Sequence, residues 1–184
     1  YTIAADIEVP QGGAEGMILT SGGRFAGYGF YLLKGKPVFL WNLLDLERLK
    51  WEGADALTPG RHTVEFDFKY DGLGAGTLVF NDFSGVGRPG TGTLKVDGKV
   101  VDTKAMPRTL PMILQWDESF DIGSDTLTGV NDADYKPPFA LTRPTVPASA
   151  RSVIGTVSTS SACAGWLSTV SMMVMPGASA RVMV

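Results

Sequence analysis

The chain has 184 residues, of which 44% are hydrophobic, 10% aromatic and 19% charged, and its formal net charge is −3. This balance is typical of a globular protein, and the length suffices for one domain with a hydrophobic core. The acidic net charge disfavours nucleic acid as a partner, and no apolar run reaches the roughly 20 residues that span a bilayer, which disfavours a membrane.

Two residue types that often carry chemistry occur only once. Cys163 is the only cysteine, so an internal disulfide is excluded and the cellular compartment stays open. His62 is the only histidine, which excludes a metal site built from several histidines. It stands at the start of an expected strand with no serine or cysteine nucleophile nearby in the sequence, so we interpret it as structural.

An alternation of apolar and polar residues dominates the first part of the chain. Residues 1–9 alternate without interruption, which predicts a strand with one buried face. Residues 15–22 predict a second, short strand. Residues 61–70 alternate again, with Phe66 and Phe68 on the buried face. These segments predict half-buried strands of an antiparallel sheet.

Two further segments predict hairpins. Residues 27–44 contain two strand-like runs around Lys34-Gly35-Lys36, and residues 91–104 contain two more around Asp97-Gly98. An Asp-Gly pair suits a type I′ turn, because both central positions need positive φ. For residues 41–53 a helical turn is the weaker alternative to a strand.

Many short strands separated by glycine and proline predict an all-β fold, a two-sheet antiparallel β-sandwich or jelly roll. We expect the sandwich to span residues 1–142, with a Gly-rich insertion loop at 71–92 and a further strand that begins at 120–125 and breaks into a polar loop.

The tail, residues 143–184, differs abruptly in composition, because it contains no Asp, Glu or Lys. One interpretation is a final pair of strands. The other, which we prefer slightly, is a segment translated out of frame from near Thr142.

Several stretches resemble the C-terminal domain of large bacterial arylsulfatases. They are Gly-Gly-Arg-Phe-Ala-Gly-Tyr-Gly at 22–29, Leu-Thr-Pro-Gly-Arg-His-Thr-Val at 57–64 and Phe-Asp-Ile-Gly-Ser-Asp at 120–125. The resemblance covers about residues 1–142. It implies a concanavalin A-like or laminin-G-like sandwich that accompanies a sulfatase catalytic domain in a parent chain.

The resemblance implies a parent enzyme that hydrolyses sulfate esters with a formylglycine and a divalent cation. The formylglycine forms in a Cys/Ser-x-Pro-x-Arg motif, and Cys163 lacks the proline and the arginine of that motif. No catalytic residue therefore transfers to this chain. The leading expectation is a non-catalytic accessory domain.

Glu65 and Asp67 are the only weak catalytic candidates. Two carboxylates two residues apart on a strand share one face, and a pair of carboxylates cuts glycosidic bonds. The spacing resembles the Glu-x-Asp-x-x-Glu strand of laminarinase-type jelly-roll hydrolases, but Tyr70 stands at the third position. We therefore interpret Glu65 and Asp67 as the solvated face of a strand, and keep a jelly-roll glycoside hydrolase as an alternative.

An acidic segment provides a candidate calcium site. Calcium takes six to eight oxygen ligands, and laminin-G-like domains often bind it in a loop. A solvated turn is the simpler interpretation, because the spacing of an EF-hand is absent. The candidate ligands are Asp121, Asp125, Asp132 and Asp134, with Asn131 beside them.

A carbohydrate-binding module is the second alternative. Aromatic faces stack on sugars, and the sequence offers Tyr28, Tyr31 and Trp41 in strands, where core packing is the simpler role. We expect the sugar contacts at the rim instead. The candidate ligand-binding residues are Arg24, Trp51, Gln115, Trp116 and Asp117.

Overall fold

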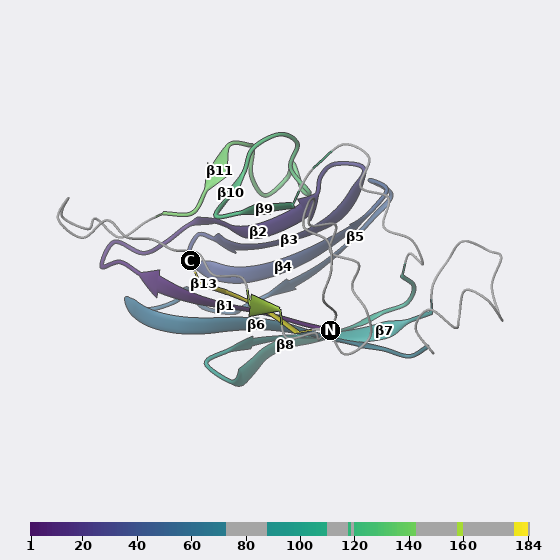
Figure 1. The fold of residues 1–184 in the computed structure, drawn as a ribbon, viewed down its shortest axis with the longest axis horizontal. Helices are drawn as coiled ribbons and strands as arrows, with labels where there is room; N and C mark the ends of the chain where they lie inside the picture. The colour runs from purple at the N-terminus through teal and green to yellow at the C-terminus, as the bar shows by residue number, and fades with distance from the viewer. Residues whose placement is uncertain (73–87, 110–117, 119, 143–157, 160–178, 184) are drawn as a thin grey trace.

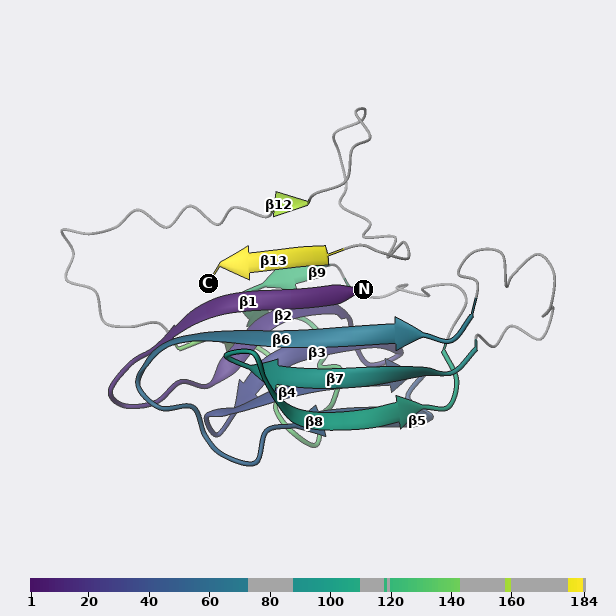
Figure 2. The ribbon, with the colours of Figure 1, turned by 90° about the horizontal axis from the view of Figure 1, so that it is seen from below.

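The computed structural model describes residues 1–72, 88–109, 118, 120–142, 158–159 and 179–183. The regular elements of these residues are β-strands, which form two sheets that face each other, here called sheet A and sheet B (Figures 1 and 2). Within the same residues, no helix is long and apolar enough to cross a bilayer. The all-β, two-sheet sandwich predicted from the sequence is confirmed.

Sheet A is built around three neighbouring antiparallel strands, β1, β6 and β7 (Figure 2). Side chains along these strands alternate between core and solvent. In spatial order its strands are β12 (Ser158–Thr159), β13 (Ser179–Met183), β1 (Thr2–Val9), β6 (Gly60–Tyr70), β7 (Gly90–Val96) and β8 (Lys99–Met106).

Sheet B carries the more deeply buried strands. In spatial order they are β10 (Ser124–Asp125), β11 (Phe139–Ala140), β2 (Gly16–Gly22), β3 (Ala26–Leu33), β4 (Lys36–Leu43) and β5 (Glu47–Glu52), and β9 (Phe120–Ile122) also pairs with β2.

Turn residues set the register of both predicted hairpins. Lys34 and Gly35, with φ of 51° and 80°, join β3 to β4, and Asp97 and Gly98, with φ of 49° and 77°, join β7 to β8. Positive φ at both central positions is the type I′ geometry, whose twist matches that of the flanking strands. Residues 47–52 form β5, so the helical alternative for this segment is wrong.

Aromatic rings fill the space between the sheets. Phe39 of β4 stacks on Phe66 of β6 with ring centroids 3.5 Å apart. Trp51 of β5 meets Phe66 edge to face at 5.0 Å, and its indole Nε1 donates a hydrogen bond to the Gly92 carbonyl of β7 at 2.9 Å. This bond crosses from one sheet to the other, so Trp51 both fills the core and satisfies a buried backbone acceptor.

The two edge strands β5 and β8 lie side by side and protect each other. Asp102 of β8 accepts a hydrogen bond from the Glu52 backbone N–H of β5 at 3.0 Å, and Lys104 Nζ donates to the Lys50 carbonyl at 2.6 Å. Free edge groups are templates for unwanted pairing with other chains. These side chains occupy two such groups and tie sheet A to sheet B.

Some sequence expectations need correction. The sheets are not purely antiparallel, because β1 pairs with β13, and β11 with β2, in parallel. The jelly-roll or concanavalin A-like connectivity stays a prediction. The insertion expected at 71–92 falls mostly on residues 73–87, outside the described residues, and Gly90–Gly92 belong to β7. Of the tail, only β12 and β13 are described, and β13 lies beside β1.

Candidate functional site

A loop of residues 126–138 lies over the outer face of sheet B, the face turned away from sheet A (Figure 1). Val130 and Tyr135 of this loop are buried against Met17 and Tyr31 of the sheet. The loop removes from water an apolar surface that would otherwise be exposed, which stabilises the fold. Sheet B therefore has a second, smaller core on its outer face, and every residue of β2 is buried.

A buried polar pair holds the two ends of this loop together. The Tyr135 hydroxyl donates to Asp125 Oδ2 at 2.5 Å and accepts from the Val130 backbone N–H at 3.1 Å. Burial raises the pKa of Asp125, and the hydrogen bond from Tyr135 lowers it in part. Burial also raises the pKa of the Tyr135 phenol, which stays protonated and remains a donor.

A second carboxylate of the loop reaches back to sheet B. Lys50 Nζ lies 3.0 Å from Asp134 Oδ2, and the Tyr31 hydroxyl donates to the same oxygen. Burial, together with the hydrogen bond to Asp134, raises the pKa of Tyr31. Asp134 thus connects the loop to β3 and β5 at once.

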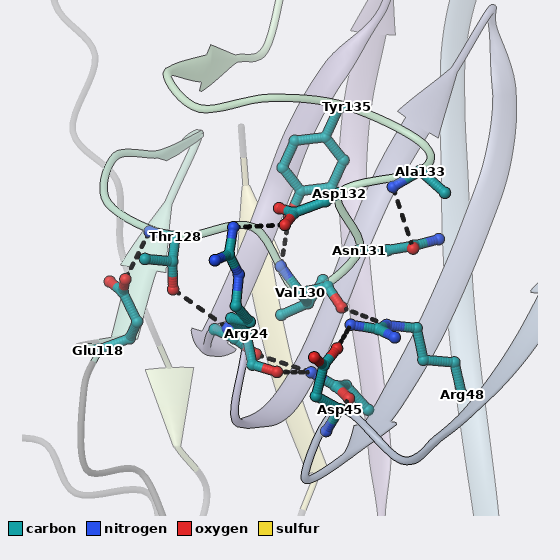
Figure 3. Close-up of polar contacts among 12 residues, drawn as sticks. Arg24, Asp45, Arg48, Glu118, Thr128, Val130, Asn131, Asp132, Ala133 and Tyr135 are labelled. Atoms are coloured by element: carbon teal, nitrogen blue, oxygen red, sulfur yellow. Dashed lines mark hydrogen bonds and ion pairs between the residues drawn. The ribbon is translucent and has the colours of Figure 1, made fainter.

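Two arginines fasten the other side of the loop (Figure 3). Arg24 forms an ion pair with Asp132 at 2.5 Å, and its backbone N–H donates to Thr128 Oγ1 at 3.1 Å. Arg48 Nε donates to the Val130 carbonyl at 3.0 Å. Arg24 thus holds two side chains of the loop, and Arg48 holds its backbone.

The predicted calcium ligands do not converge on one point. Asp125 faces Tyr135, Asp132 faces Arg24 and Asp134 faces Lys50, while Asp121 accepts a hydrogen bond from Thr126 Oγ1 at 3.1 Å. In the described part of the chain, no three His, Cys, Asp or Glu side chains are placed to hold a metal ion. Each of these carboxylates has a protein partner in the structure, and the calcium site stays a prediction.

The predicted ligand-binding residues lie in different environments or outside the described part of the chain. Trp51 has no exposed surface, so its expected place at the rim is wrong. Arg24 is half-exposed but is paired with Asp132. Gln115, Trp116 and Asp117 lie outside the described residues. Among the other aromatic candidates, Tyr28 and Tyr31 are buried and Trp41 packs against the core.

Glu65 and Asp67 lie on the outer face of sheet A. Lys95, directly opposite on β7, forms an ion pair with Glu65 at 2.7 Å. Thr2, directly opposite on β1, donates to Asp67 Oδ1 at 2.8 Å. Cross-strand pairs of this kind stabilise a sheet. The two carboxylates are bonded within sheet A, in keeping with their interpretation as a solvated strand face.

His62 joins three segments at the opposite end of β6 from Tyr70. Its Nδ1 lies 2.7 Å from Asp97 Oδ2 and its Nε2 lies 2.8 Å from the Thr58 carbonyl oxygen. A carboxylate and a carbonyl are both acceptors, so both ring nitrogens must carry protons to make both bonds. Asp97 also accepts from the Thr63 backbone N–H at 2.8 Å. The arrangement therefore favours the imidazolium ion.

The pKa of His62 should be measurable without interference, since it is the only histidine. Partial burial lowers this pKa, but the bonds to Asp97 and Thr58 outweigh that effect and raise it above 6.5. We expect the imidazole Cε1–H resonance to titrate at higher pH in the folded chain than in the urea-unfolded chain. Asp97→Asn keeps an Asn-Gly turn and should lower the folded midpoint. An unchanged midpoint in that variant would contradict the assignment.

The sign of the linked stability follows from both pKa shifts. The raised pKa of His62 contributes stability below its ordinary pKa, and this is lost as the pH rises through the raised value. The His62 bond and the Thr63 N–H lower the pKa of Asp97, whose contribution is lost as the pH falls through that lowered value. The His62–Asp97 pair therefore stabilises the fold most at pH values between the ordinary pKa of aspartate and the ordinary pKa of histidine.

Four exposed apolar side chains at one end of the sandwich were missed by the sequence analysis. The exposed fractions are 59% for Phe25, 39% for Leu44, 84% for Leu46 and 64% for Leu127. We call these four residues the apolar tip. The sequence contained one indication of these exposed residues. Leu44 and Leu46 lie inside a short turn between strands, where polar residues are usual.

The fold and the site define a two-sheet β-sandwich with a loop fastened over one outer face. A comparison with protein-family models, with curated proteins and with solved structures finds no match.

Proposed function

We propose that this chain is a non-catalytic accessory domain, similar to the C-terminal domain of bacterial arylsulfatases, that serves a sulfatase catalytic domain in a longer protein. The observation that carries the proposal is the 126–138 loop, which covers the outer face of sheet B with Val130 and Tyr135. An enzyme or a glycan-binding module of this architecture needs an open, concave surface for its ligand. Here residues 126–138 of the chain itself occupy the outer face of sheet B.

The carboxylates support the same proposal against the hydrolase alternative. General acid–base catalysis needs a carboxyl group that can reach the substrate and exchange a proton with it. Glu65 and Asp67 are bonded to Lys95 and Thr2, and the loop carboxylates are bonded to Tyr, Lys and Arg side chains. These groups hold strands and the loop in place.

The aromatic residues argue against the carbohydrate-binding alternative. A sugar platform needs aromatic faces open to solvent. Trp51 and Tyr31 instead lie fully inside the two cores, and Tyr28 stacks on Phe39 with centroids 5.7 Å apart. Trp51, Tyr31 and Tyr28 therefore favour packing over glycan recognition.

The test uses the purified chain in two assays. In the first, a fluorogenic aryl sulfate is offered to the chain, and no turnover above buffer is expected. In the second, the chain runs through native gels that contain different polysaccharides, and its mobility should match that in a gel without polysaccharide. Turnover would contradict a non-catalytic role. Retardation by one polysaccharide would replace the accessory role with glycan binding.

A further inference from the structure

Residues 53–59 connect β5 of sheet B to β6 of sheet A, and we call them the crossover connection. Leu57 fastens this connection to sheet B, because its N–H donates to the Gly35 carbonyl at 2.9 Å and its side chain packs against the main core. The His62 ring fastens it to sheet A, because Nε2 lies 2.8 Å from the Thr58 carbonyl oxygen. One side chain of β6 therefore controls how the two sheets are joined there.

The His62 ring belongs to the inner face of β6. The residue is directly opposite Ile7 of β1 and shares its face with Val64, and both of these neighbours are buried. From the β7–β8 hairpin, Asp97 is paired with the ring, and the charge of Lys99 acts in turn on Asp97. Asp97 is therefore the carboxylate that faces the imidazole. The other charged residues of these segments belong to the outer face or are exposed: Asp6, Glu8, Arg61 and Asp55.

The two ring nitrogens of His62 have partners of different charge. Nδ1 lies 2.7 Å from a carboxylate oxygen of Asp97, whereas Nε2 faces the neutral carbonyl of Thr58. A hydrogen bond to an ionised acceptor is about twice as strong as one between neutral groups. When the imidazolium ion loses one proton, Nδ1 therefore keeps its proton and Nε2 gives up its own. The neutral ring is thus the Nδ1–H tautomer.

A second group of Thr58 is placed to serve the deprotonated nitrogen. The Thr58 hydroxyl oxygen lies 3.4 Å from His62 Nε2. A hydroxyl can donate a hydrogen bond, whereas a carbonyl oxygen can only accept one. Without its proton, Nε2 repels the carbonyl oxygen and accepts from the hydroxyl. Loss of one proton therefore transfers the bond from the Thr58 backbone to the Thr58 side chain.

We propose that His62 is a pH-dependent switch, which fastens the crossover connection to sheet A when the ring is protonated and releases the Thr58 carbonyl when the ring is neutral. After release, the neighbouring Leu57 N–H opens to solvent more often, because the connection has lost one of its two fastenings. Partial burial lowers the pKa of His62, but the bonds to Asp97 and Thr58 outweigh it, so the switch operates above the ordinary histidine range.

Nitrogen NMR of the full chain with ¹⁵N in the histidine ring tests the direction of proton loss. The signals are unambiguous, because His62 is the only histidine. As the pH rises, we expect the Nε2 resonance to move to the position of an unprotonated nitrogen while Nδ1 keeps that of a protonated one. A neutral ring with its proton on Nε2 would overturn the proposal.

Hydrogen exchange over the same pH range measures the release. The protection of the Leu57 amide, corrected for the intrinsic pH dependence of exchange, should fall about fivefold as His62 becomes neutral, because a charged hydrogen bond is replaced by a neutral one. Leu46 is the matched control, since its N–H also donates over 2.9 Å in a turn, at the other end of β4. Constant protection of Leu57, or an equal fall at Leu46, would contradict a local switch.

A pair of matched variants tests the hydroxyl. Thr58→Val keeps the carbonyl and the branched shape but removes the donor to the neutral ring, so the titration midpoint of His62 should rise. Thr63→Val is the control, because the Thr63 hydroxyl donates to Asp6 at 2.7 Å and not to the ring. Its midpoint should match that of the wild-type chain. An unchanged midpoint in Thr58→Val would refute the exchange of partners.

Discussion

Replacing Trp51 with alanine is expected to lower the free energy of unfolding by about 3–5 kcal/mol, the cost usual for deleting a large buried aromatic side chain. The indole has no exposed surface and meets Phe39 and Phe66 edge to face. Its removal leaves a cavity between the sheets. It also leaves the Gly92 carbonyl without its donor.

Denaturant titration of the wild-type chain and two variants measures this effect. Trp51→Phe keeps much of the ring volume but removes the Nε1 donor, so it should lose less than Trp51→Ala. Gly92→Ala tests the same contact from sheet A, because a Cβ there would lie 2.6 Å from the indole. We expect it to be strongly destabilising as well. A loss below about 1 kcal/mol for Trp51→Ala would contradict this view of the core.

Replacing Tyr135 with phenylalanine is expected to cost about 2–3 kcal/mol at pH 7, although it removes one oxygen atom. The hydroxyl serves two buried groups, the Asp125 carboxylate and the Val130 N–H. Both lose their partner at once. We expect the Val130 amide to exchange with solvent faster in the variant, because its bond to Tyr135 holds the loop down.

The cost of Tyr135→Phe should depend on pH in a defined direction. Burial raises the pKa of Asp125, and the Tyr135 hydrogen bond opposes that shift, so the variant should raise it further. A raised carboxyl pKa means that the folded state holds the proton more strongly than the unfolded state. The stability of the Tyr135→Phe variant therefore improves as the pH falls through the raised pKa of Asp125, and the loss relative to wild type should be smaller at acidic pH. Equal losses at neutral and acidic pH would refute the role of the hydroxyl.

The β framework could be predicted from the sequence because it depends on local signals. The alternation in residues 1–9 and 61–70 places Ile3 and Phe66 in the core, as the structure has them. Asp97-Gly98 fixes its hairpin through the φ values that the pair tolerates. Each of these predictions needs only neighbouring residues.

The loop over sheet B could not be predicted, because its partners are distant in sequence. Spacing within 121–134 suggested shared metal ligation, whereas the actual partners are cations and a phenol on β3, β5 and the β2–β3 turn. The alternation of residues along β5 could have indicated that one face of this strand carries cations and the other face carries a core residue. Arg48 and Lys50 face the loop, and Trp51, on the other face, points into the core.

The apolar tip escaped sequence analysis for a related reason. A single exposed leucine is normal on a protein surface. What distinguishes Leu44 is its positive φ and its place beside Phe25, and both depend on the register of β3 and β4.

The most direct test of the accessory role is the nucleotide sequence upstream of the Tyr1 codon. If the domain has this accessory role, the reading frame continues upstream into a catalytic domain with a Cys/Ser-x-Pro-x-Arg motif, from which formylglycine is made. A stop codon immediately before Tyr1, or an upstream frame without that motif, would contradict the accessory role in a sulfatase.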